Sequence, residues 1–176
     1  MIDMLKTEIE DVLLLRPLVH ADSRGCFFES YNKMLLSKMN LEIDFVQDNE
    51  SKSDFGVLRG IHFQKPPFEQ SKLVRVIKGK IQDIAIDLRP SSDTYKKYVS
   101  IILDDNKKEQ LFIPKGFGHA FLALSEEVIV SYKVDCIYNK DSESGIKYDD
   151  PSINIDWKLD KNKIIISDKD NSLPYL

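Results

Sequence analysis

The sequence contains few of the residues on which disulfide-rich and metal-binding proteins depend. Of its 176 residues only two are cysteine, Cys26 and Cys136, and they form no CxxC pair. This usage predicts free thiols in a reducing compartment rather than a disulfide scaffold or a zinc site. The three histidines, His20, His62 and His119, stand far apart, whereas metal-binding barrels usually offer closely spaced ligands such as HxH. We therefore expect no metal site.

The chain also lacks long apolar runs and an excess of positive charge. Apolar stretches such as residues 12–15 and 120–124 are too short to span a bilayer, and no basic flank with an apolar segment opens the sequence. The 25 Lys and Arg against 29 Asp and Glu leave a net charge of −4. No general basic field therefore attracts nucleic acid or an anionic membrane. We expect a cytoplasmic protein that binds neither.

Motifs of several enzyme classes are absent as well. The sequence has no GxGxxG or GxxxxGKS/T phosphate-binding loop and no GxSxG nucleophile elbow. Helical segments do not alternate with strands, which disfavours a doubly wound parallel sheet. Each cysteine is better interpreted as a small buried apolar residue than as a nucleophile.

What the sequence does contain is a series of short strand patterns with one helix. The helix is expected over residues 34–39, capped by Asn32 and ended by Asn40. Lys78-Gly79 predicts a hairpin between the two runs that flank it. The strands are expected at residues 12–15, 26–30, 44–49, 56–64, 72–78, 80–88, 98–103, 110–114, 119–124 and 128–138.

This pattern predicts a mainly β fold, an antiparallel sandwich or barrel closed as a jelly roll with a few short helices, in a single domain over residues 1–176. Within residues 80–88, one face carries Ile84 and Ile86 and is expected in the core. The other face carries Asp83 and Asp87 and is expected to line a polar cavity. The tail after residues 164–166 is expected to be tied to the body.

Residues 57–64, Val-Leu-Arg-Gly-Ile-His-Phe-Gln, place an arginine and a histidine inside an apolar strand. Burying both is costly unless they have partners. Alternate residues of a strand share a face, so Arg59 and His62 point to opposite faces unless a bulge at Gly60 redirects them. A site that uses both residues therefore requires that bulge.

Acid–base chemistry has three candidate residues. His62 is suited to act as a base near neutral pH, Lys72 as a fixed cation for a developing oxyanion, and Tyr132 as a phenolic proton donor. Each has a structural alternative: a core histidine bound to a backbone carbonyl, a solvated strand charge, and a core aromatic residue. Residues 114–121 place Lys115 and His119 where a strand starts, to meet an anion or hydroxyl, or simply to form a β-turn.

Together these segments resemble the dTDP-4-dehydrorhamnose 3,5-epimerase family, whose members are cupin-type jelly rolls. The resemblance covers almost the whole chain. It rests on Asp22-Ser23-Arg24-Gly25, Phe28-Glu29, residues 45–49, residues 57–64, Lys72-Leu73-Val74-Arg75, residues 113–119, Tyr132-Lys133, Glu143 and Ser167-Asp168-Lys169-Asp170.

The resemblance implies an isomerase that acts on a nucleoside-diphosphate 4-keto-6-deoxy sugar. C3 and C5 flank the C4 ketone, so loss of either proton gives an enolate, and protonation on the opposite face inverts the centre. The family match implies His62 as the base, Asp170 as its hydrogen-bond partner, Lys72 at the enolate oxygen, and Tyr132 as the acid. No redox or metal cofactor is needed, because the substrate already carries the ketone.

The resemblance also implies the residues that bind the substrate. Arg24 and Arg59 match diphosphate partners, and Tyr138 matches an aromatic residue that stacks on the nucleobase. Family members are dimers that share strands, which implies a homodimer in which Arg24 and Glu29 serve the neighbour's site. Further matching contact positions are Gln47, Asn49, His119, Glu143 and Lys169.

Several alternatives stay open at this point. The chain departs from the family at Ile137, Tyr148, Ser71 and the segment Gly118-His119-Ala120, and none of these removes a catalytic group. Related enzymes act at C3 only, or on GDP-linked 6-deoxy-4-keto heptoses of capsules, and retention of Tyr132 favours action at C5 as well. A 3,4-ketoisomerase on the same scaffold and a non-catalytic sugar-binding jelly roll are the remaining alternatives.

Overall fold

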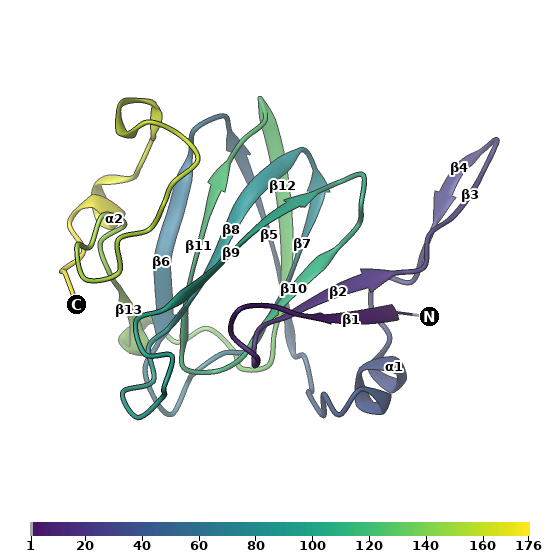
Figure 1. Cartoon of the computed structure of the whole chain (residues 1–176), viewed down its shortest axis with the longest axis horizontal. Helices are drawn as coiled ribbons and strands as arrows, with labels where there is room; N and C mark the ends of the chain where they lie inside the picture. Colours follow the sequence, from purple (N-terminus) through teal and green to yellow (C-terminus); the bar gives the residue numbers. More distant parts are fainter. Residues whose placement is uncertain (1) are drawn as a thin grey trace.

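Two antiparallel β-sheets packed face to face form the body of the protein, as the computed structural model of residues 2–176 shows (Figure 1). The predicted mainly β, antiparallel jelly-roll class is confirmed. The six-stranded sheet has the order β1 (Ile2–Lys6), β2 (Leu13–Pro17), β10 (Gln110–Ile113), β7 (Lys72–Lys78), β12 (Glu127–Val134) and β5 (Gln47–Asp54). The five-stranded sheet has the order β13 (Glu143–Gly145), β6 (Leu58–Gln64), β11 (Phe117–Ala123), β8 (Lys80–Asp87) and β9 (Tyr98–Asp104).

The central strands of both sheets are covered on their two faces. Val74 and Val130 of one sheet meet Ile81 and Phe121 of the other in the core between them. Helix α1 (Lys33–Lys38) and the loop after it cover the outer face of the six-stranded sheet. Residues 146–157 cover the outer face of the five-stranded sheet. Burial on both faces explains why several strands are continuously apolar instead of alternating.

Helix α1 follows its sequence signals. The Asn32 side chain accepts a hydrogen bond from the Leu35 backbone N–H at 3.3 Å, which satisfies one of the free donors at the helix start. Asn40 lies just beyond the end with a φ of 61°, a left-handed conformation that asparagine tolerates. The predicted cap and the predicted end are both confirmed.

The predicted hairpin at Lys78-Gly79 is wrong. Strand β7 belongs to the six-stranded sheet and β8 to the five-stranded sheet, so Gly79 is a corner where the chain passes from one sheet to the other. Gly79 has a φ of 85°, and a Cβ there would lie 2.4 Å from the Glu127 carbonyl oxygen. A hairpin and a sandwich corner use the same glycine chemistry, so the sequence pattern does not separate them.

The polar face of β8 also departs from expectation. All of its residues from Ile81 to Asp87 are buried, and neither Asp83 nor Asp87 lines the main cavity. Asp87 instead accepts hydrogen bonds from Arg89, Ser92 and Thr94 and fixes the loop that follows the strand.

Strand β5 begins at Gln47, three residues later than predicted, and runs on to Asp54. Its sequence, QDNESKSD, has no apolar alternation, because its inward-facing residues line a polar cavity. Because the inner face of β5 is polar, the apolar alternation that marks a strand is absent, and the sequence did not predict the full extent of this strand. The prediction also missed β1, β3 (His20–Asp22), β13, the 3-10 turns η1 (Lys140–Ser142) and η2 (Lys161–Lys163), and the short helix α2 (Asp168–Asn171).

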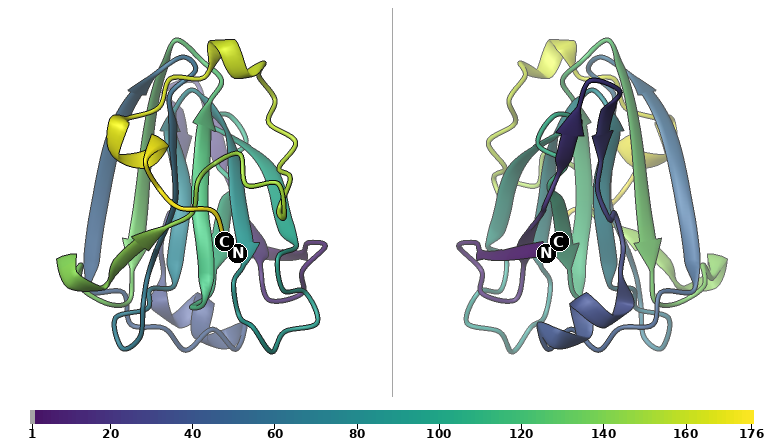
Figure 2. Two further views of the ribbon diagram at one scale, coloured as in Figure 1. Left: turned by 90° about the vertical axis from the view of Figure 1, so that its left-hand side faces the viewer. Right: turned by 90° about the vertical axis from the view of Figure 1, so that its right-hand side faces the viewer.

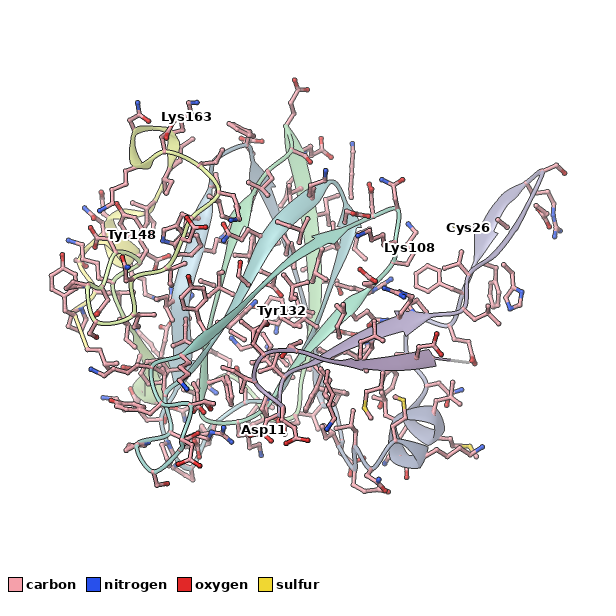
Figure 3. The ribbon with its side chains drawn as sticks, viewed as in Figure 1. Asp11, Cys26, Lys108, Tyr132, Tyr148 and Lys163 are labelled. Carbon is pink, nitrogen blue, oxygen red and sulfur yellow. The ribbon has the colours of Figure 1, made fainter. Side chains whose placement is uncertain are left out.

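A two-stranded hairpin, β3 (His20–Asp22) and β4 (Gly25–Phe27), projects away from the sandwich (Figure 1). We call it the arm. The strand predicted for residues 26–30 ends at Phe27, within the arm. Cys26 lies exposed on the arm, outside the sandwich body that holds Tyr132 (Figure 3), so its expected burial is wrong. Cys136 is half-buried.

The C-terminal segment crosses the outer side of the five-stranded sheet (Figure 2). The Leu58 N–H donates to the Ile165 carbonyl at 2.8 Å, and the Ile165 N–H donates to the Gly56 carbonyl at 2.8 Å. The expectation that the tail is tied to the body is confirmed. This attachment carries α2 to the outer edge of β6.

Within residues 2–176, no helix has the length and apolar character needed to cross a membrane.

The bulge required at Gly60 is present. His62 pairs with His119 and Arg59 pairs with Phe121, so two residues of β6 lie opposite Ala120 of β11. Gly60 has a φ of 118°, and a Cβ there would lie 2.6 Å from both the Ala120 Cβ and the His119 carbonyl oxygen. The bulge turns Arg59 and His62 toward the same cavity.

We predict that Gly60→Ala lowers the free energy of unfolding by about 3 kcal/mol, because it adds backbone strain to a clash with β11. Chemical denaturation measures this change. Gly25→Ala is the matched control: its φ is 128°, but no atom of residues 2–176 of the same chain lies within 4 Å of the added Cβ. Strain alone should make this control about 1 kcal/mol less stable. Equal losses in the two variants would contradict the role of the close contact.

Candidate active site

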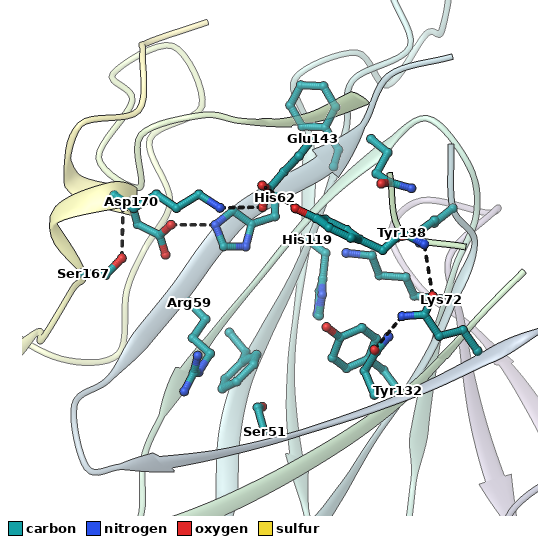
Figure 4. A pocket seen from close by; sticks show the side chains of 17 residues that line it. Ser51, Arg59, His62, Lys72, His119, Tyr132, Tyr138, Glu143, Ser167 and Asp170 are labelled. Atoms are coloured by element: carbon teal, nitrogen blue, oxygen red, sulfur yellow. Dashed lines mark hydrogen bonds and ion pairs between the residues drawn. The ribbon is translucent and has the colours of Figure 1, made fainter. Parts of the chain in front are cut away.

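A cavity of about 380 Å³ lies between the two sheets, with α2 at one side (Figure 4). Side chains from β5, β7 and β12 line it on one side, and side chains from β6 and β11 line it on the other. All predicted site residues except Arg24 and Glu29 are found in its wall: Gln47, Asn49, Arg59, His62, Lys72, His119, Tyr132, Tyr138, Glu143, Lys169 and Asp170.

His62 and Asp170 form a close pair. His62 Nε2 lies 2.7 Å from Asp170 Oδ1, and the Gly60 N–H donates to Asp170 Oδ2 at 3.3 Å. Ser167 Oγ accepts from the Asp170 N–H at 3.1 Å and begins α2. Burial acts to raise the pKa of Asp170, but the hydrogen bond and charge of His62 outweigh it and hold the pKa below its usual value. The carboxylate is therefore ionised beside the imidazole, and the backbone-carbonyl alternative for His62 is wrong.

Lys72 and Tyr132 share the inner face of neighbouring strands. Lys72 is 8% exposed, so the alternative of a solvated strand charge is wrong. Its Nζ lies 5.9 Å from the centre of the Tyr132 ring. Burial lowers the pKa of Lys72 to about 8, against the opposing attraction of Asp83. Burial raises the pKa of Tyr132, so its phenol stays protonated at neutral pH.

A second histidine–carboxylate pair lies deeper in the sandwich. His119 Nε2 is 2.7 Å from Asp83 Oδ1, and both residues are buried. Burial lowers the pKa of His119, while the charge and hydrogen bond of Asp83 oppose that shift. The neutral imidazole is therefore the form that faces the cavity. Lys115, expected near His119, instead pairs with Asp135 at 3.3 Å.

Hydrogen bonds between partly exposed polar side chains surround the outer part of the cavity. The Tyr138 hydroxyl donates to Glu143 at 3.0 Å, and Lys169 Nζ lies 2.6 Å from the same carboxylate. The hydrogen bond from Lys169 and its charge hold the pKa of Glu143 below its usual value. Gln47 Oε1 accepts from the Tyr138 backbone N–H at 3.0 Å, and its amide donates to Asn49 at 2.8 Å.

Arg59 is anchored at one edge of its guanidinium. Nε donates to Ser53 Oγ at 3.0 Å, and Nη2 donates to the Lys52 carbonyl at 3.0 Å. These two bonds fix the plane of the group, and the remaining donors are left for a ligand. A planar fork of this kind suits a phosphate or carboxylate.

Sequence reasoning missed part of the wall. Gln64 is structural, because its amide donates to the Phe68 carbonyl and accepts from the Asn139 N–H. Ser51 Oγ is buried with no hydrogen-bond partner in residues 2–176. Uncharged and charged polar residues alternate over residues 47–53. This alternation was the signal that could have identified Ser51 as an inward-facing residue. The other missed residues are Phe63, Gln70, Phe121 and Ser167.

Arg24 and Glu29 lie away from this cavity. Arg24 sits at the turn of the arm, where its side chain is 88% exposed and binds only Asp22 among the described residues. Glu29 accepts a hydrogen bond from Asn32 at 3.0 Å. The structure therefore does not bring these two predicted residues to the site of their own chain.

Residues 2–176 contain no group of three or more His, Cys, Asp or Glu side chains placed to hold a metal ion. The arrangement instead offers an imidazole with an ionised carboxylate partner, a buried ammonium and a protonated phenol around one cavity. These are the elements needed to remove a proton, stabilise the resulting anion and return a proton.

Comparison with known proteins gives a consistent family. The model of the family described as dTDP-4-dehydrorhamnose 3,5-epimerase matches residues 6–176. The dTDP-4-dehydrorhamnose 3,5-epimerase of Methanothermobacter thermautotrophicus is 48% identical, over 96% of this chain and 91% of that protein. The enzyme of the same name from Escherichia coli K12 is 44% identical, over 97% and 92%.

Solved structures agree. The chain superimposes on a dTDP-4-dehydrorhamnose 3,5-epimerase from Bacillus anthracis, bound to TDP and PPi, with a TM-score of 0.96 and 42% identity over all of both chains. The dTDP-6-deoxy-D-glucose-3,5-epimerase of Legionella pneumophila, in complex with dTDP-4-keto-L-rhamnose, gives a TM-score of 0.96 at 37% identity, over 99% of this chain and 93% of that one.

The buried ammonium leads to a prediction about pH. Burial depresses the pKa of Lys72, so its charge is complete well below pH 8 and is lost as the pH rises through about 8. NMR titration of the Lys72 side chain should show that midpoint. Lys33 is the control, because its ion pair with Asp44 raises its pKa and keeps it charged over the same range. A Lys72 midpoint above about 10, the value of a solvated lysine, would contradict the effect of burial.

Proposed function

The chain belongs to the dTDP-4-dehydrorhamnose 3,5-epimerase family, and we propose that it converts dTDP-4-dehydro-6-deoxyglucose to dTDP-4-dehydrorhamnose by inverting C3 and C5. The observation that carries the proposal is the placement of the His62–Asp170 pair, Lys72 and Tyr132 around one cavity. Binding of dTDP-4-keto-L-rhamnose by the Legionella relative supports the same substrate class.

His62 removes the proton next to the C4 ketone. Its Nε2 is bonded to Asp170, so the neutral ring carries its proton there and presents the lone pair of Nδ1. The ionised carboxylate then stabilises the imidazolium that forms when Nδ1 takes the proton. Asp170 is held in turn by the Gly60 N–H and by its place in α2.

Lys72 stabilises the enolate oxygen at C4, and Tyr132 returns the proton. A buried ammonium acts on a developing oxyanion more strongly than one in water, because the local dielectric is low. The raised pKa of Tyr132 keeps its hydroxyl available as a donor. No redox or metal step is required by this chemistry.

The remaining cavity residues hold the nucleotide and the sugar. We assign Arg59 to the diphosphate, since its fixed guanidinium keeps free donors toward the cavity. Tyr138, half exposed, is placed to stack on the nucleobase. We assign the other substrate contacts to Gln47, Asn49, His119, Glu143 and Lys169.

We also propose a homodimer in which the arm completes the neighbour's site. The arm projects from the sandwich (Figure 1), and Phe27, the last residue of β4 at the base of the arm, is 69% exposed. Arg24 and Glu29 do not line the cavity of their own chain. The family resemblance nevertheless assigns both residues to substrate binding. The arm carries one exposed aromatic residue and one exposed arginine, and both residue types are enriched at protein contacts.

Two further assignments belong to this proposal. We take residues 1–176 as a single epimerase domain, which the family match to residues 6–176 supports. We place the protein in the cytoplasm, because Cys26 and Cys136 are free thiols, as expected in a reducing compartment.

The proposal predicts that the enzyme exchanges two carbon-bound protons of its substrate with solvent. In D₂O, NMR should show deuterium entering both C3 and C5 of dTDP-4-dehydro-6-deoxyglucose. His62→Ala should reduce this exchange by at least about 10²–10⁴-fold, because the base is lost.

His62→Asn is the companion variant, since it keeps a donor for Asp170 while removing the base, and a matching melting temperature separates chemistry from folding. Exchange at C3 alone would make the protein a single-centre epimerase. Exchange only in a GDP-linked 6-deoxy-4-keto heptose would move it to capsule synthesis. Carbonyl migration that survives Tyr132→Phe would identify a 3,4-ketoisomerase, and no exchange in any substrate would favour a sugar-binding protein.

The shared site predicts that two inactive variants rescue each other. In a mixed dimer, an intact pocket on an Arg24→Ala subunit receives the intact arm of a His62→Ala subunit. An equal mixture, refolded together, should regain activity in about a quarter of its sites, because half the dimers are mixed and one of their two sites is complete. Each variant refolded alone is the control. No recovery in a mixture shown to contain mixed dimers would mean that Arg24 acts in its own chain.

A further inference from the structure

Asp83 is a charged residue in an apolar part of the core. It is 0% exposed and lies on the inner face of β8. Its neighbours on that face, Ile81 and Ala85, are core residues, and it pairs across the ladder with Phe121 of β11. Asp83 Oδ1 bonds to His119 Nε2 at 2.7 Å, and Asp83 Oδ2 has no hydrogen-bond partner in residues 2–176.

Stability alone does not explain this carboxylate. A buried charge with incomplete hydrogen bonding is unfavourable, and well-packed apolar residues often replace such groups without loss. The chain is able to satisfy a buried aspartate fully four residues further along the same face. Asp87 accepts from Arg89 Nε at 2.9 Å, from Ser92 Oγ at 2.6 Å and from Thr94 Oγ1 at 2.6 Å.

The bond to Asp83 decides which nitrogen of His119 is free. Nε2 is occupied, and Nδ1 makes no hydrogen bond to the part of the chain that the structure describes. Burial disfavours the charged ring, and the positive charges that face it, Lys72 and a protonated His62, disfavour it further. The neutral ring therefore keeps its proton on Nε2 and leaves Nδ1 as an acceptor in the cavity wall.

We propose that Asp83 is a positioning residue of the epimerisation, which fixes His119 with Nδ1 free to accept a hydrogen bond from a ring hydroxyl of the sugar. The proposal rests on the proposed function for its substrate. A 4-keto-6-deoxy hexose offers hydroxyl donors beside the reacting carbons, and an acceptor at a fixed place orients the C4 ketone relative to His62 and Lys72.

Asp83 has a second effect on the same site. It is the charge that acts on Lys72 in favour of the ammonium form. Removing it should therefore move the loss of the Lys72 proton to lower pH, and with it the alkaline limb of the kcat profile. A residue that merely fills space in the core has no such effect.

The test compares Asp83→Asn with Asp87→Asn, the same change at two buried positions on one face of β8. Asp83→Asn should keep the melting temperature or raise it, lower kcat/KM by about 10- to 100-fold, and shift the alkaline limb of kcat to lower pH. Asp87→Asn should do the reverse: lower the melting temperature and leave kcat/KM and the pH limb unchanged. Neither Asp87 nor its partners touch the cavity.

The tautomer of His119 provides a readout that requires no turnover. Side-chain ¹⁵N NMR of the wild-type protein should show the proton on Nε2, and Asp83→Asn should give a mixture, because an amide can donate as well as accept. A wild-type ring protonated on Nδ1 would overturn the proposal even if Asp83→Asn fails to fold. Unchanged kinetics and pH limb in a folded Asp83→Asn would also overturn it. Absence of wild-type turnover would instead count against the proposed function.

Discussion

The close approach of β6 to β11 at Gly60 is the constraint on which the site depends. Because Gly60 has no side chain, two residues of β6 fit opposite Ala120. The extra residue shifts the in-and-out alternation of the side chains that follow it by one residue. A regular strand would have aimed Arg59 and His62 at opposite faces. The same segment supplies the N–H of Gly60 to Asp170, so the bulge also holds the partner of the imidazole. One backbone irregularity therefore sets the orientation of both side chains and adds a hydrogen bond to Asp170, whose helix α2 is brought there by the pairing of Ile165 with Gly56 and Leu58.

Placing ionisable groups inside a β-sandwich imposes a second constraint, because each buried charge needs an oppositely charged or hydrogen-bonding partner close to it. The cavity meets it with paired groups: His62 with Asp170, His119 with Asp83, and Glu143 with Lys169. The pairs differ in burial, and burial affects the protonation state of each pair and its access to a ligand. The deep pair is buried and holds a neutral ring, whereas the pair of Glu143 and Lys169 is partly exposed and open to a ligand.

Local sequence signals were sufficient for the fold class, for α1 and its Asn32 cap, and for strands with apolar or alternating patterns such as β7. They failed at Gly79, where a sandwich corner and a hairpin use the same residue, and at β5, whose inner face is polar because it lines the cavity. His62, Lys72 and Tyr132 were candidates from residue chemistry alone, and the other predicted cavity residues came from motifs that match a known family. The pairing of His119 with Asp83 could not come from spacing, because 36 residues separate them and only the ladder between β8 and β11 brings them together.

The contrast between the two ends of the cavity bears on how the enzyme uses its substrate. Proton transfer needs fixed geometry, and in the proposed reaction the buried Lys72 and His119 supply it from the strands, while His62, whose side chain is 33% exposed, is fixed by Asp170. In the proposed reaction a nucleotide needs access, and we assign that role to the outer end, where Tyr138, Glu143 and Lys169 lie on the segment after β12, on β13 and on α2. The two charged partners missing from this end, Arg24 and Glu29, are carried by the arm and the segment after it. An arm that closes this end in a second subunit would leave the deep end unchanged and would couple enclosure of the nucleotide to dimer formation.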